Sequence, residues 1–425
     1  MQLFGLADCN NFFCSCERVF HPELQNVPVV VLSNNDGCVI ARSEESKRLG
    51  LKMGVPLYQV RDLIETNHVA VFSSNYTLYG SLSNRVMSLL AQYTPHLTQY
   101  SIDEAFLDFS GLGDSACLKT YGERIATQVK KATGIPISLG IAGTKTLAKV
   151  ASKYAKKYPG YKGCCMIDTE EKRIKALTDF DVKDVWGIGR HLYKTLNYYG
   201  VNTAADFANK SDSWIKGKFN VPVLQTWKEL NGISCIEVEA LPEKKSICTS
   251  RSFADQGVTN HSILEEAVAN FAAASADKLR SQKSCCRGIT VFAYTSRFRM
   301  DIPQHAIHQS TTLNIPTQSS AEIIGVALQM LRSNLRQGNY AYKKAGVILW
   351  DISSQQQVQQ DLFDPIDRTK QFALMKAIDS INRKNGRDKI RVAVQGTDIR
   401  FGLKRAYLSK QYTTDIKDII VAKAE

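Results

Sequence analysis

Apolar residues recur along the first part of the chain with the spacing of short strands. Residues 3–7 read as a buried strand that ends at Asp8, and a helical stretch follows it. Residues 27–32 form a second apolar run. The Ser-Asn-Asn-Asp-Gly sequence at 33–37 is a strong turn signal, so residues 38–41 are predicted to return as the hairpin partner.

Longer helical patterns fill the rest of the first 170 residues and alternate with one more strand. Their apolar residues recur at intervals of three and four, which is the period of a helix with one buried face. The predicted elements are helices at 43–49, 78–93, 116–132 and 145–158 and a strand at 137–142. Strands and helices in this alternation, with one inserted subdomain, predict a mixed sheet covered by helices.

Past residue 170 the chain changes character twice. A small helical segment begins near Lys172, and residues 241–245 read as a linker. The separate domain predicted to follow has helices at 263–279 and 321–335 and strands at 287–294, 309–315 and 345–351. After residue 352 the chain becomes glutamine-rich. We expect one helix at 371–381 and an end, from about residue 385, that is irregular or ordered only on partners.

Adjacent carboxylates interrupt an apolar run at residues 100–109, which read Tyr-Ser-Ile-Asp-Glu-Ala-Phe-Leu-Asp-Phe. Burying one ionised carboxylate without a partner is costly, and burying two side by side costs more. A strand keeps such a pair, here Asp103 and Glu104, when a cation binds there. Asp8 ends a similar apolar run, so two strands could bring carboxylates to one edge of a sheet. Such an all-oxygen site suits Mg²⁺, and two ions can clamp the attacking and leaving oxygens of a phosphoryl transfer.

Strand geometry restricts this metal hypothesis. Neighbours in an ideal strand point to opposite faces, so Asp103 and Glu104 can face one metal only if the chain bends. A hairpin turn near residues 100–102 would supply the bend. The alternative is a strand in which Asp103 accepts a hydrogen bond and Glu104 is solvated. The spacing alone leaves both interpretations open.

The composition narrows the class of protein. The chain has 425 residues, 44% of them hydrophobic and 22% charged, which is enough for about two to four domains with sizeable cores. A formal net charge of +13 favours a polyanionic partner, nucleic acid before a membrane surface. No apolar run reaches the length of a membrane helix, and the N-terminus lacks the basic region of a secretory signal. The 11 cysteines include no C-x-x-C pair, which argues against a zinc ribbon and fits reduced thiols in a cytoplasm.

A basic stripe is predicted on the helix at 145–158. It consists of Lys145, Lys149, Lys153 and Lys156, and no acid within the helix relieves their repulsion. A solvated face usually mixes signs, so the stripe favours a contact with phosphate over plain exposure to solvent. For Lys47, on the short helix at 43–49, both a solvated position and a triphosphate contact stay open.

A glycine turn joins two short helices near residue 188. Gly187 and Gly189 flank Ile188, and Arg190 and Lys194 follow. Glycines let a backbone approach a partner closely, and the N–H groups that open the next helix favour a phosphate. This is the helix-hairpin-helix pattern of sequence-independent DNA binding. The alternative is a tight turn without a ligand.

Three long motifs resemble the Y family of DNA polymerases, and the resemblance covers nearly the whole chain. They are Ser-Asn-Asn-Asp-Gly-Cys-Val-Ile-Ala-Arg at 33–42, Tyr-Ser-Ile-Asp-Glu-Ala-Phe at 100–106 and Asp-Val-Trp-Gly-Ile-Gly-Arg at 184–190. The resemblance implies an α+β multidomain fold shaped as a right-hand polymerase. Its implied parts are a ferredoxin-like palm at 1–14 and 80–170, small fingers at 15–79, a helix-hairpin-helix thumb at 171–235, an α/β little finger at 243–352 and a C-terminal tail at 353–425.

The same resemblance implies roles for individual residues. Asp8, Asp103 and Glu104 match the catalytic carboxylates, which bind two Mg²⁺ ions together with the backbone carbonyl of Cys9. Phe13 matches the aromatic steric gate under the sugar; its neighbour Phe12 walls the same pocket or belongs to the core. The other matches are Lys47 and Lys156 for the triphosphate, Gly187, Gly189 and Arg190 for DNA, and Gln359, Leu362 and Phe363 in a clamp-binding peptide at 359–363.

Three positions depart from the family pattern. Many members have an acid two residues after Asp8, where this chain has Asn10, so Asn10 is not counted as a ligand. Glu44 stands where a tyrosine is common, and Lys47 stands where other members have arginine. Arginine binds phosphate with two parallel hydrogen bonds and lysine does not, so the contact expected from Lys47 is the weaker one.

The resemblance implies an error-prone, template-directed DNA polymerase that copies damaged templates in the SOS response. No separate cluster of exonuclease acids is visible, so no proofreading is expected. The implied partners in the cytoplasm are primer-template DNA, dNTPs, a sliding clamp, a processed UmuD-like dimer and a RecA filament, with no membrane. Two other classes stay open. A nucleotide cyclase also carries paired carboxylates on a palm-type sheet, although the basic thumb and little finger argue against it. A non-catalytic DNA-binding relative would be expected to have lost one of the three acids.

Overall fold

The computed structural model describes residues 2–237, 243–254, 256–359, 361–386, 388–397 and 401–421. The chain divides into two compact units, Met1–Ala240 with Arg405–Glu425 as unit 1 and Leu241–Lys404 as unit 2. Each unit has hydrophobic cores of its own. Among the described helices, none combines the length and the apolarity needed to span a bilayer.

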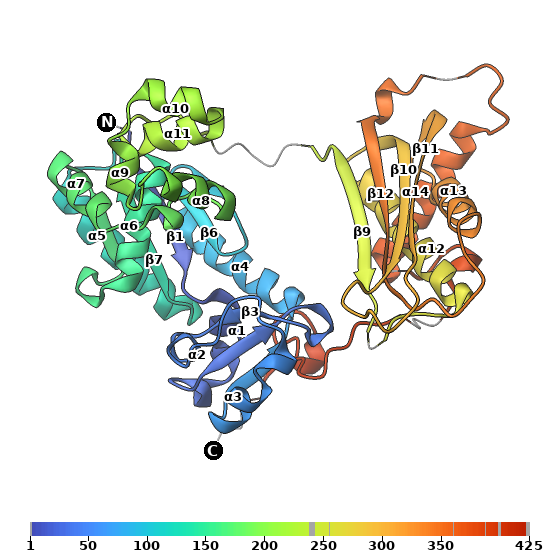
Figure 1. Ribbon diagram of the computed structural model, residues 1–425, viewed down its shortest axis with the longest axis horizontal. Coiled ribbons are helices and arrows are strands. Elements are labelled where there is room, and N and C mark those ends of the chain that lie inside the picture. Colours follow the sequence, from blue (N-terminus) through green and yellow to red (C-terminus); the bar gives the residue numbers. More distant parts are fainter. Residues whose placement is uncertain are drawn as a thin grey trace. The chain divides into compact units, whose positions relative to one another are not determined.

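Unit 1 is built around a mixed sheet with the strand order β5-β6-β1-β7-β8 (Figure 1). Its strands are β1 (Phe4–Cys9), β5 (Leu97–Gln99), β6 (Glu104–Asp108), β7 (Ile137–Ala142) and β8 (Cys164–Ile167). β1 pairs antiparallel with both β6 and β7, while β7 pairs parallel with β8. The mixed sheet predicted from the sequence is therefore confirmed.

Helices cover both faces of this sheet, because apolar side chains of its strands point alternately to one face and the other. Ala7, Ala105 and Leu139 belong to one core, in which α4 (Tyr76–Leu90) and α5 (Ser115–Thr133) pack. Leu6 and Phe106 belong to the core on the other face, which α6 (Lys145–Lys157) covers. Asp8 and Glu104 have the same parity as Leu6 and Phe106, so their side chains face α6.

A smaller sheet with the order β3-β2-β4 is inserted between β1 and α4. It is formed by β2 (Val29–Leu32), β3 (Val39–Arg42) and β4 (Ala70–Ser73), with α1 (Phe12–Phe20), α2 (Glu44–Arg48) and α3 (Arg61–Thr66) in the same region. The predicted hairpin is confirmed, since β2 and β3 pair antiparallel. Its turn holds Asn35 at φ 61° and Asp36 at φ 52°, a left-handed conformation that Asn and Asp tolerate better than most residues.

The predicted small helical segment that follows is also confirmed. It contains α7 (Glu170–Thr178), α8 (Arg190–Tyr198), α9 (Ala204–Ala208), α10 (Asp212–Lys218) and α11 (Val221–Leu230). Apolar residues of this segment, among them Leu196, Phe207 and Leu230, share a core with α6. The segment is therefore packed onto the sheet face that carries Asp8 and Glu104.

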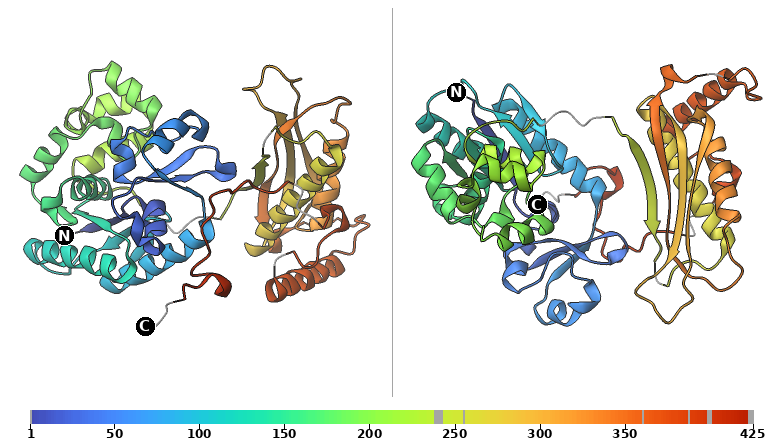
Figure 2. Two further views of the ribbon diagram at one scale, coloured as in Figure 1. Left: turned by 90° about the horizontal axis from the view of Figure 1, so that it is seen from below. Right: turned by 45° about the horizontal axis from the view of Figure 1, so that its top comes forward.

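Unit 2 is a sheet with the order β11-β10-β12-β9 and helices on one face (Figure 2). Its elements are β9 (Ser246–Ser252), α12 (His261–Ser281), β10 (Ser284–Thr295), β11 (Ala306–Thr317), α13 (Ser320–Arg332), β12 (Tyr342–Ser354) and α14 (Arg368–Asn385). All three pairs of neighbouring strands are antiparallel. The predicted elements are present, but β9, with few apolar residues, has no counterpart among them.

The end of the chain corrects one expectation. The described residues after Asn385 are irregular, as predicted, apart from short turns at Ala393–Gln395 and Ile416–Asp418. They are not, however, ordered only by partners. Residues from Arg405 onward belong to unit 1, where Tyr412 packs on its core and stacks on Phe20 with ring centroids 4.5 Å apart. The tail of 353–425 is therefore divided between the two units.

Candidate active site

Asp8 and Glu104 lie directly opposite each other on β1 and β6. Residues paired in this way point to the same face of a sheet. The chain bends just before Glu104, where the N–H groups of Tyr100 and Ser101 both donate to the Glu104 carbonyl at 3.0 and 3.1 Å. This is the predicted hairpin turn. It places Asp103 outside the strand alternation, and the Cys9 N–H holds the Asp103 carbonyl at 2.9 Å.

Hydrogen bonds fix the turn and separate the two interpretations of the acidic pair. Ser101 Oγ donates to Asp103 Oδ1 at 2.6 Å and accepts from the Glu104 N–H at 3.0 Å. The hydrogen bond to Asp103 agrees with the alternative in which no metal binds. Glu104 does not agree with it, because its side chain is only 13% exposed and forms an ion pair with Lys149 at 2.9 Å.

Two lysines of α6 supply the counter-charge for the acids. Lys149 pairs with Glu104, and Lys156 Nζ lies 2.9 Å from Asp8 Oδ1. The other lysines of the stripe also have partners, since Lys145 donates to the Ile236 carbonyl and Lys153 to the Asp184 carbonyl. α6 itself contains no acid, as the sequence showed, and the acids that relieve the repulsion come from β1 and β6.

α6 lies on β7 with almost no space between their backbones. A Cβ atom added to Gly140 on β7 would lie 2.0 Å from the Ala148 carbonyl oxygen and 2.1 Å from the Ser152 nitrogen of α6. Ser152 Oγ also donates to the Ser138 carbonyl at 3.1 Å. This close approach sets the height of Lys149 and Lys156 above the acids.

The local electrostatics favour a cation. Burial raises the pKa of Glu104, and the charges of Asp8 and Asp103 raise it further, while Lys149 opposes them. Burial also raises the pKa of the Cys9 thiol, with Asp103 and Asp8 adding to the effect. Cys9 therefore stays a thiol, and only its carbonyl oxygen is available as a ligand for Mg²⁺.

The donor set fits Mg²⁺ by its chemistry, because Asp8, Asp103, Glu104 and the Cys9 carbonyl offer only oxygen. Within the described residues, no group of three or more His, Cys, Asp or Glu side chains is gathered in metal-binding geometry. The lysine ion pairs account for this arrangement, since they draw Asp8 and Glu104 toward α6.

The two aromatic residues after β1 have different environments. Phe12 is 4% exposed and belongs to the core, as one of its two interpretations held. Phe13 is half-buried and stacks on Tyr79 of α4, with ring centroids 4.5 Å apart and planes 18° apart. Tyr76 meets Phe13 edge-on at 5.9 Å. Phe13 is therefore a partly accessible plate with a rigid backing.

Lys47 lies in a small polar network beside the start of α1. Its Nζ donates to Glu44 Oε1 at 2.6 Å and to Asn11 Oδ1 at 2.7 Å. Burial opposes the ionisation of Glu44, but hydrogen bonds from Lys47 and Asn11 outweigh it and hold the pKa of Glu44 below its ordinary value. The charge of Lys156 also lowers the pKa of Glu44.

The glycine turn at residues 187–189 packs against the turn at residues 100–103. Trp186 Nε1 donates to the Tyr100 hydroxyl at 3.1 Å, and the two rings meet edge-on. Gly187, at φ 91°, and Gly189 are exposed, and Arg190 opens α8 with its side chain also exposed. The helix-hairpin-helix connection thus presents its glycine backbone and Arg190 to solvent.

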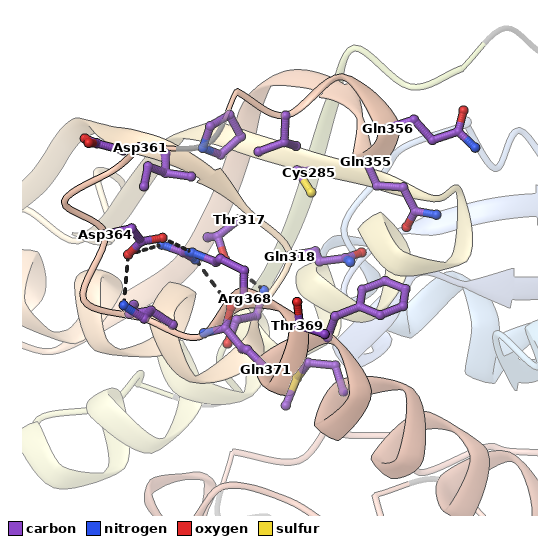
Figure 3. A pocket seen from close by; sticks show the side chains of 17 residues that line it. Cys285, Thr317, Gln318, Gln355, Gln356, Asp361, Asp364, Arg368, Thr369 and Gln371 are labelled. Atoms are coloured by element: carbon purple, nitrogen blue, oxygen red, sulfur yellow. Dashed lines mark hydrogen bonds and ion pairs between the residues drawn. The ribbon is translucent and has the colours of Figure 1, made fainter.

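The predicted clamp-binding peptide forms the tip of a loop in unit 2, although its residue Gln360 lies outside the described residues. Leu362 is 94% exposed and Phe363 is 87% exposed. Figure 3 shows the base of the loop, where Asp364 and Arg368 point toward each other beside a pocket of about 560 Å³. Arg368 also donates to Glu322 at 2.8 Å. The base is anchored while two large apolar side chains face solvent.

Several residues of the site were not among those predicted. Lys149 was noted only as part of the stripe, although its spacing of seven from Lys156 places both on one face of α6. The sequence gives only a weak indication of Glu17 and Tyr79, which support Phe13. The one sign is that Glu17 follows Phe13 by four positions, one helical turn.

The comparisons with known proteins agree over the whole chain. Residues 7–153 match the impB/mucB/samB family, residues 244–362 match the C-terminal domain of the same family, and residues 373–422 match a domain of unknown function. Protein ImpB of Salmonella typhimurium is 42% identical over 425 residues, which cover 99% of this chain and 100% of the relative. The chain belongs to the impB/mucB/samB family. Protein UmuC of Salmonella typhimurium strain LT2 is 41% identical over 424 residues, with the same coverage.

Solved structures place this family member in the Y-family fold. A chimera of the Y-family polymerases Dbh and Dpo4 superposes with a TM-score of 0.65 at 21% identity, covering 83% of this chain and 99% of the chimera. The protein is a Y-family DNA-directed DNA polymerase of the error-prone, translesion class. The nucleotide cyclase and the non-catalytic relative are therefore set aside.

Proposed function

We propose that Asp8, Asp103 and Glu104, with the Cys9 carbonyl, hold two Mg²⁺ ions and that this site adds deoxynucleotides to a primer end. The observation that carries the proposal is the opposition of Asp8 and Glu104 across β1 and β6, with Asp103 in the adjoining turn. When bound, two such ions activate the primer hydroxyl and stabilise the charge on the leaving pyrophosphate. The all-oxygen donor set supports this choice of ion.

The lysines have two roles in this proposal. Lys149 and Lys156 neutralise Glu104 and Asp8, so that these partly buried acids do not destabilise the folded state. Lys156 and Lys47 then contact the triphosphate, because Lys156 lies 2.9 Å from Asp8 and Lys47 bonds to Asn11, three residues after Asp8. Each contributes a point charge, so the orientation of the triphosphate depends on having both.

Phe13 is proposed as the plate that selects the sugar. Its ring is backed by Tyr79, so a 2′-hydroxyl that collides with it cannot push it aside at low cost. A 2′-hydrogen is small enough to pass. This is selection by exclusion, which discriminates without any added attractive contact.

The remaining proposals concern the whole molecule. We assign the palm to 1–14 and 80–170, the fingers to 15–79, the thumb to 171–235 and the little finger to 243–352, in agreement with the two sheets of unit 1 and the sheet of unit 2. Gly187, Gly189 and Arg190 contact the DNA backbone, and Gln359, Leu362 and Phe363 bind a sliding clamp. From the resemblance to the Y family we also propose action in the cytoplasm during the SOS response, with a UmuD-like dimer and a RecA filament as partners.

The test of the site is Asp103→Asn, measured by insertion of one nucleotide and by binding to primer-template DNA. Insertion is expected to fall at least about a thousandfold, roughly 4 kcal/mol of transition-state stabilisation, while DNA binding stays within about twofold. Asp108→Asn is the matched control, because Asp108 ends the adjoining strand β6 and accepts a hydrogen bond from the Ser110 N–H at 2.9 Å. Insertion by Asp103→Asn at the rate of Asp108→Asn would refute the assignment.

A further inference from the structure

The C-terminal strap, residues 405–414, folds back onto unit 1 (Figure 2, dark red). The Ala406 N–H donates to Asp36 Oδ2 at 2.7 Å, and Asp36 also accepts from Ser73 Oγ at 2.6 Å. Tyr407 exchanges hydrogen bonds with Ser73, through its carbonyl at 2.9 Å and its N–H at 3.0 Å. Asp36 is therefore more than a turn residue, because it also binds a segment 370 positions away in the sequence.

Farther along, the strap reaches a buried acid on α1. Ser409 Oγ donates to Glu17 Oε1 at 3.0 Å, and the Tyr79 hydroxyl donates to the same oxygen at 2.6 Å. Glu17 is fully buried, and its Oε2 has no hydrogen-bond partner among the described residues. Because a buried carboxylate is costly to leave unpaired, Glu17 depends on these two hydroxyls.

Tyr79 connects this acid to the proposed sugar plate. Its ring is fully buried and stacks on Phe13, and its hydroxyl is held by Glu17, one helical turn after Phe13 on α1. Burial, and then the charge of Glu17, raise the pKa of Tyr79, so the phenol remains a donor. The backing of Phe13 is therefore fixed at both ends, by the stack and by the hydrogen bond.

The strap also holds the start of the helix that carries Tyr79. Asn75 caps α4, and its Nδ2 donates to the carbonyl and the hydroxyl of Ser409, both at 3.1 Å. Ser83, two turns into α4, donates to the Ile102 carbonyl in the turn at residues 100–103. Ser409 thus bonds to both supports of the plate, the acid on α1 and the cap of α4.

We propose that the strap positions Phe13 through Ser409, Glu17 and Tyr79, so that Ser409 is a positioning residue for sugar selection. The proposal rests on the proposed role of Phe13 as the plate. Loss of the Ser409 hydroxyl leaves Glu17 with one donor and removes one of the acceptors that hold Asn75 Nδ2 at the cap of α4. The Tyr79 ring then tilts, Phe13 follows it, and a 2′-hydroxyl is admitted. A role is thereby given to part of the segment that matches a domain of unknown function.

The test uses the full chain with the same accessory proteins in every assay. Ser409→Ala, Ser409→Thr and Thr413→Ala are compared for kcat and KM with one dNTP and the matching rNTP, and for thermal stability. Thr413 is the matched control because it bonds from the strap to Ser81 of α4 at 3.0 Å without reaching Glu17. Ser409→Ala should lower selectivity for the deoxy sugar about threefold, mainly through a lower KM for the rNTP. Ser409→Thr, which keeps a hydroxyl, and Thr413→Ala should keep the wild-type selectivity.

Combination with Phe13→Ala separates this proposal from the one on which it rests. If Ser409 acts through the plate, Ser409→Ala should have no further effect on selectivity once Phe13 is alanine. Wild-type selectivity in Ser409→Ala, an equal loss in Thr413→Ala, or an undiminished effect in the double variant would overturn the role of the strap. Unchanged selectivity in Phe13→Ala itself would instead overturn the plate.

Discussion

Gly140→Ala should loosen the contact that holds the lysines of α6 over the acids. The added methyl would lie 2.0 Å from the Ala148 carbonyl oxygen and 2.1 Å from the Ser152 nitrogen. Ordinary contacts between such atoms are about 3.5 Å, so α6 must move by more than about 1 Å relative to β7. Both atoms belong to a helix backbone, which cannot yield as the end of a flexible side chain can.

The magnitude follows from this displacement. Overpacking a core costs roughly 1–3 kcal/mol, and a clash with backbone belongs at the upper end, so we expect about 3 kcal/mol of lost stability in unit 1. Lys149 and Lys156 move with α6. At urea concentrations too low to unfold the protein, insertion of a nucleotide should therefore fall about tenfold or more. Urea unfolding followed by tryptophan fluorescence measures the first effect, since three of the four tryptophans, Trp186, Trp214 and Trp227, lie in unit 1.

Gly143→Ala is the control for this prediction. Gly143 follows the same strand, and the nearest atom to its added Cβ is 3.9 Å away. Its substitution should change stability by no more than about 0.5 kcal/mol. If Gly140→Ala and Gly143→Ala unfold at the same urea concentration and insert nucleotides equally well, the close packing does not position the lysines.

Two further predictions concern Phe13 and the exposed apolar pair Leu362 and Phe363. Phe13→Ala should raise ribonucleotide incorporation relative to deoxyribonucleotide by at least about tenfold, or roughly 1.4 kcal/mol. Phe12→Ala should mainly destabilise the core. Loss of selectivity in the Phe12 variant alone would show that Phe12, and not Phe13, is the plate. Replacing Leu362 and Phe363 by alanine should weaken processive synthesis on clamp-loaded DNA but leave single insertions intact, since each side chain contributes about 1.5–3 kcal/mol when buried in a partner. An unchanged affinity for the clamp in a pull-down would count against that peptide.

Local pattern predicted most elements of the fold. The hairpin around residues 33–37, the strand at 137–142 and α6 each follow from signals within a dozen residues, namely turn chemistry, a continuous apolar run and helical period. The bend before Glu104 was predicted because two adjacent acids in one strand could not share a face otherwise. Where periodicity was weak, as in the mostly polar β9, pairing with β12 decides the structure, and the local sequence does not show it.

Long-range pairing accounts for what the sequence did not reveal. Lys156 and Asp8 are 148 positions apart, so the stripe on α6 looked unopposed. Ser409 and Glu17 are 392 positions apart, and a polar tail without periodicity is typical of a disordered end. In both cases the partner is a buried or half-buried acid on another element, and only the fold shows which one.

Three carboxylates and one carbonyl are proposed to hold the ions that carry the chemistry. The most direct measurement counts Mn²⁺ ions bound to the full chain with a dideoxy-terminated primer-template and the next dNTP, using the electron paramagnetic resonance of free Mn²⁺. We expect two ions per complex in the wild type and fewer in Asp103→Asn, with Asp108→Asn unchanged. Equal binding in wild type and Asp103→Asn, or no ion bound in the wild-type complex, would contradict it.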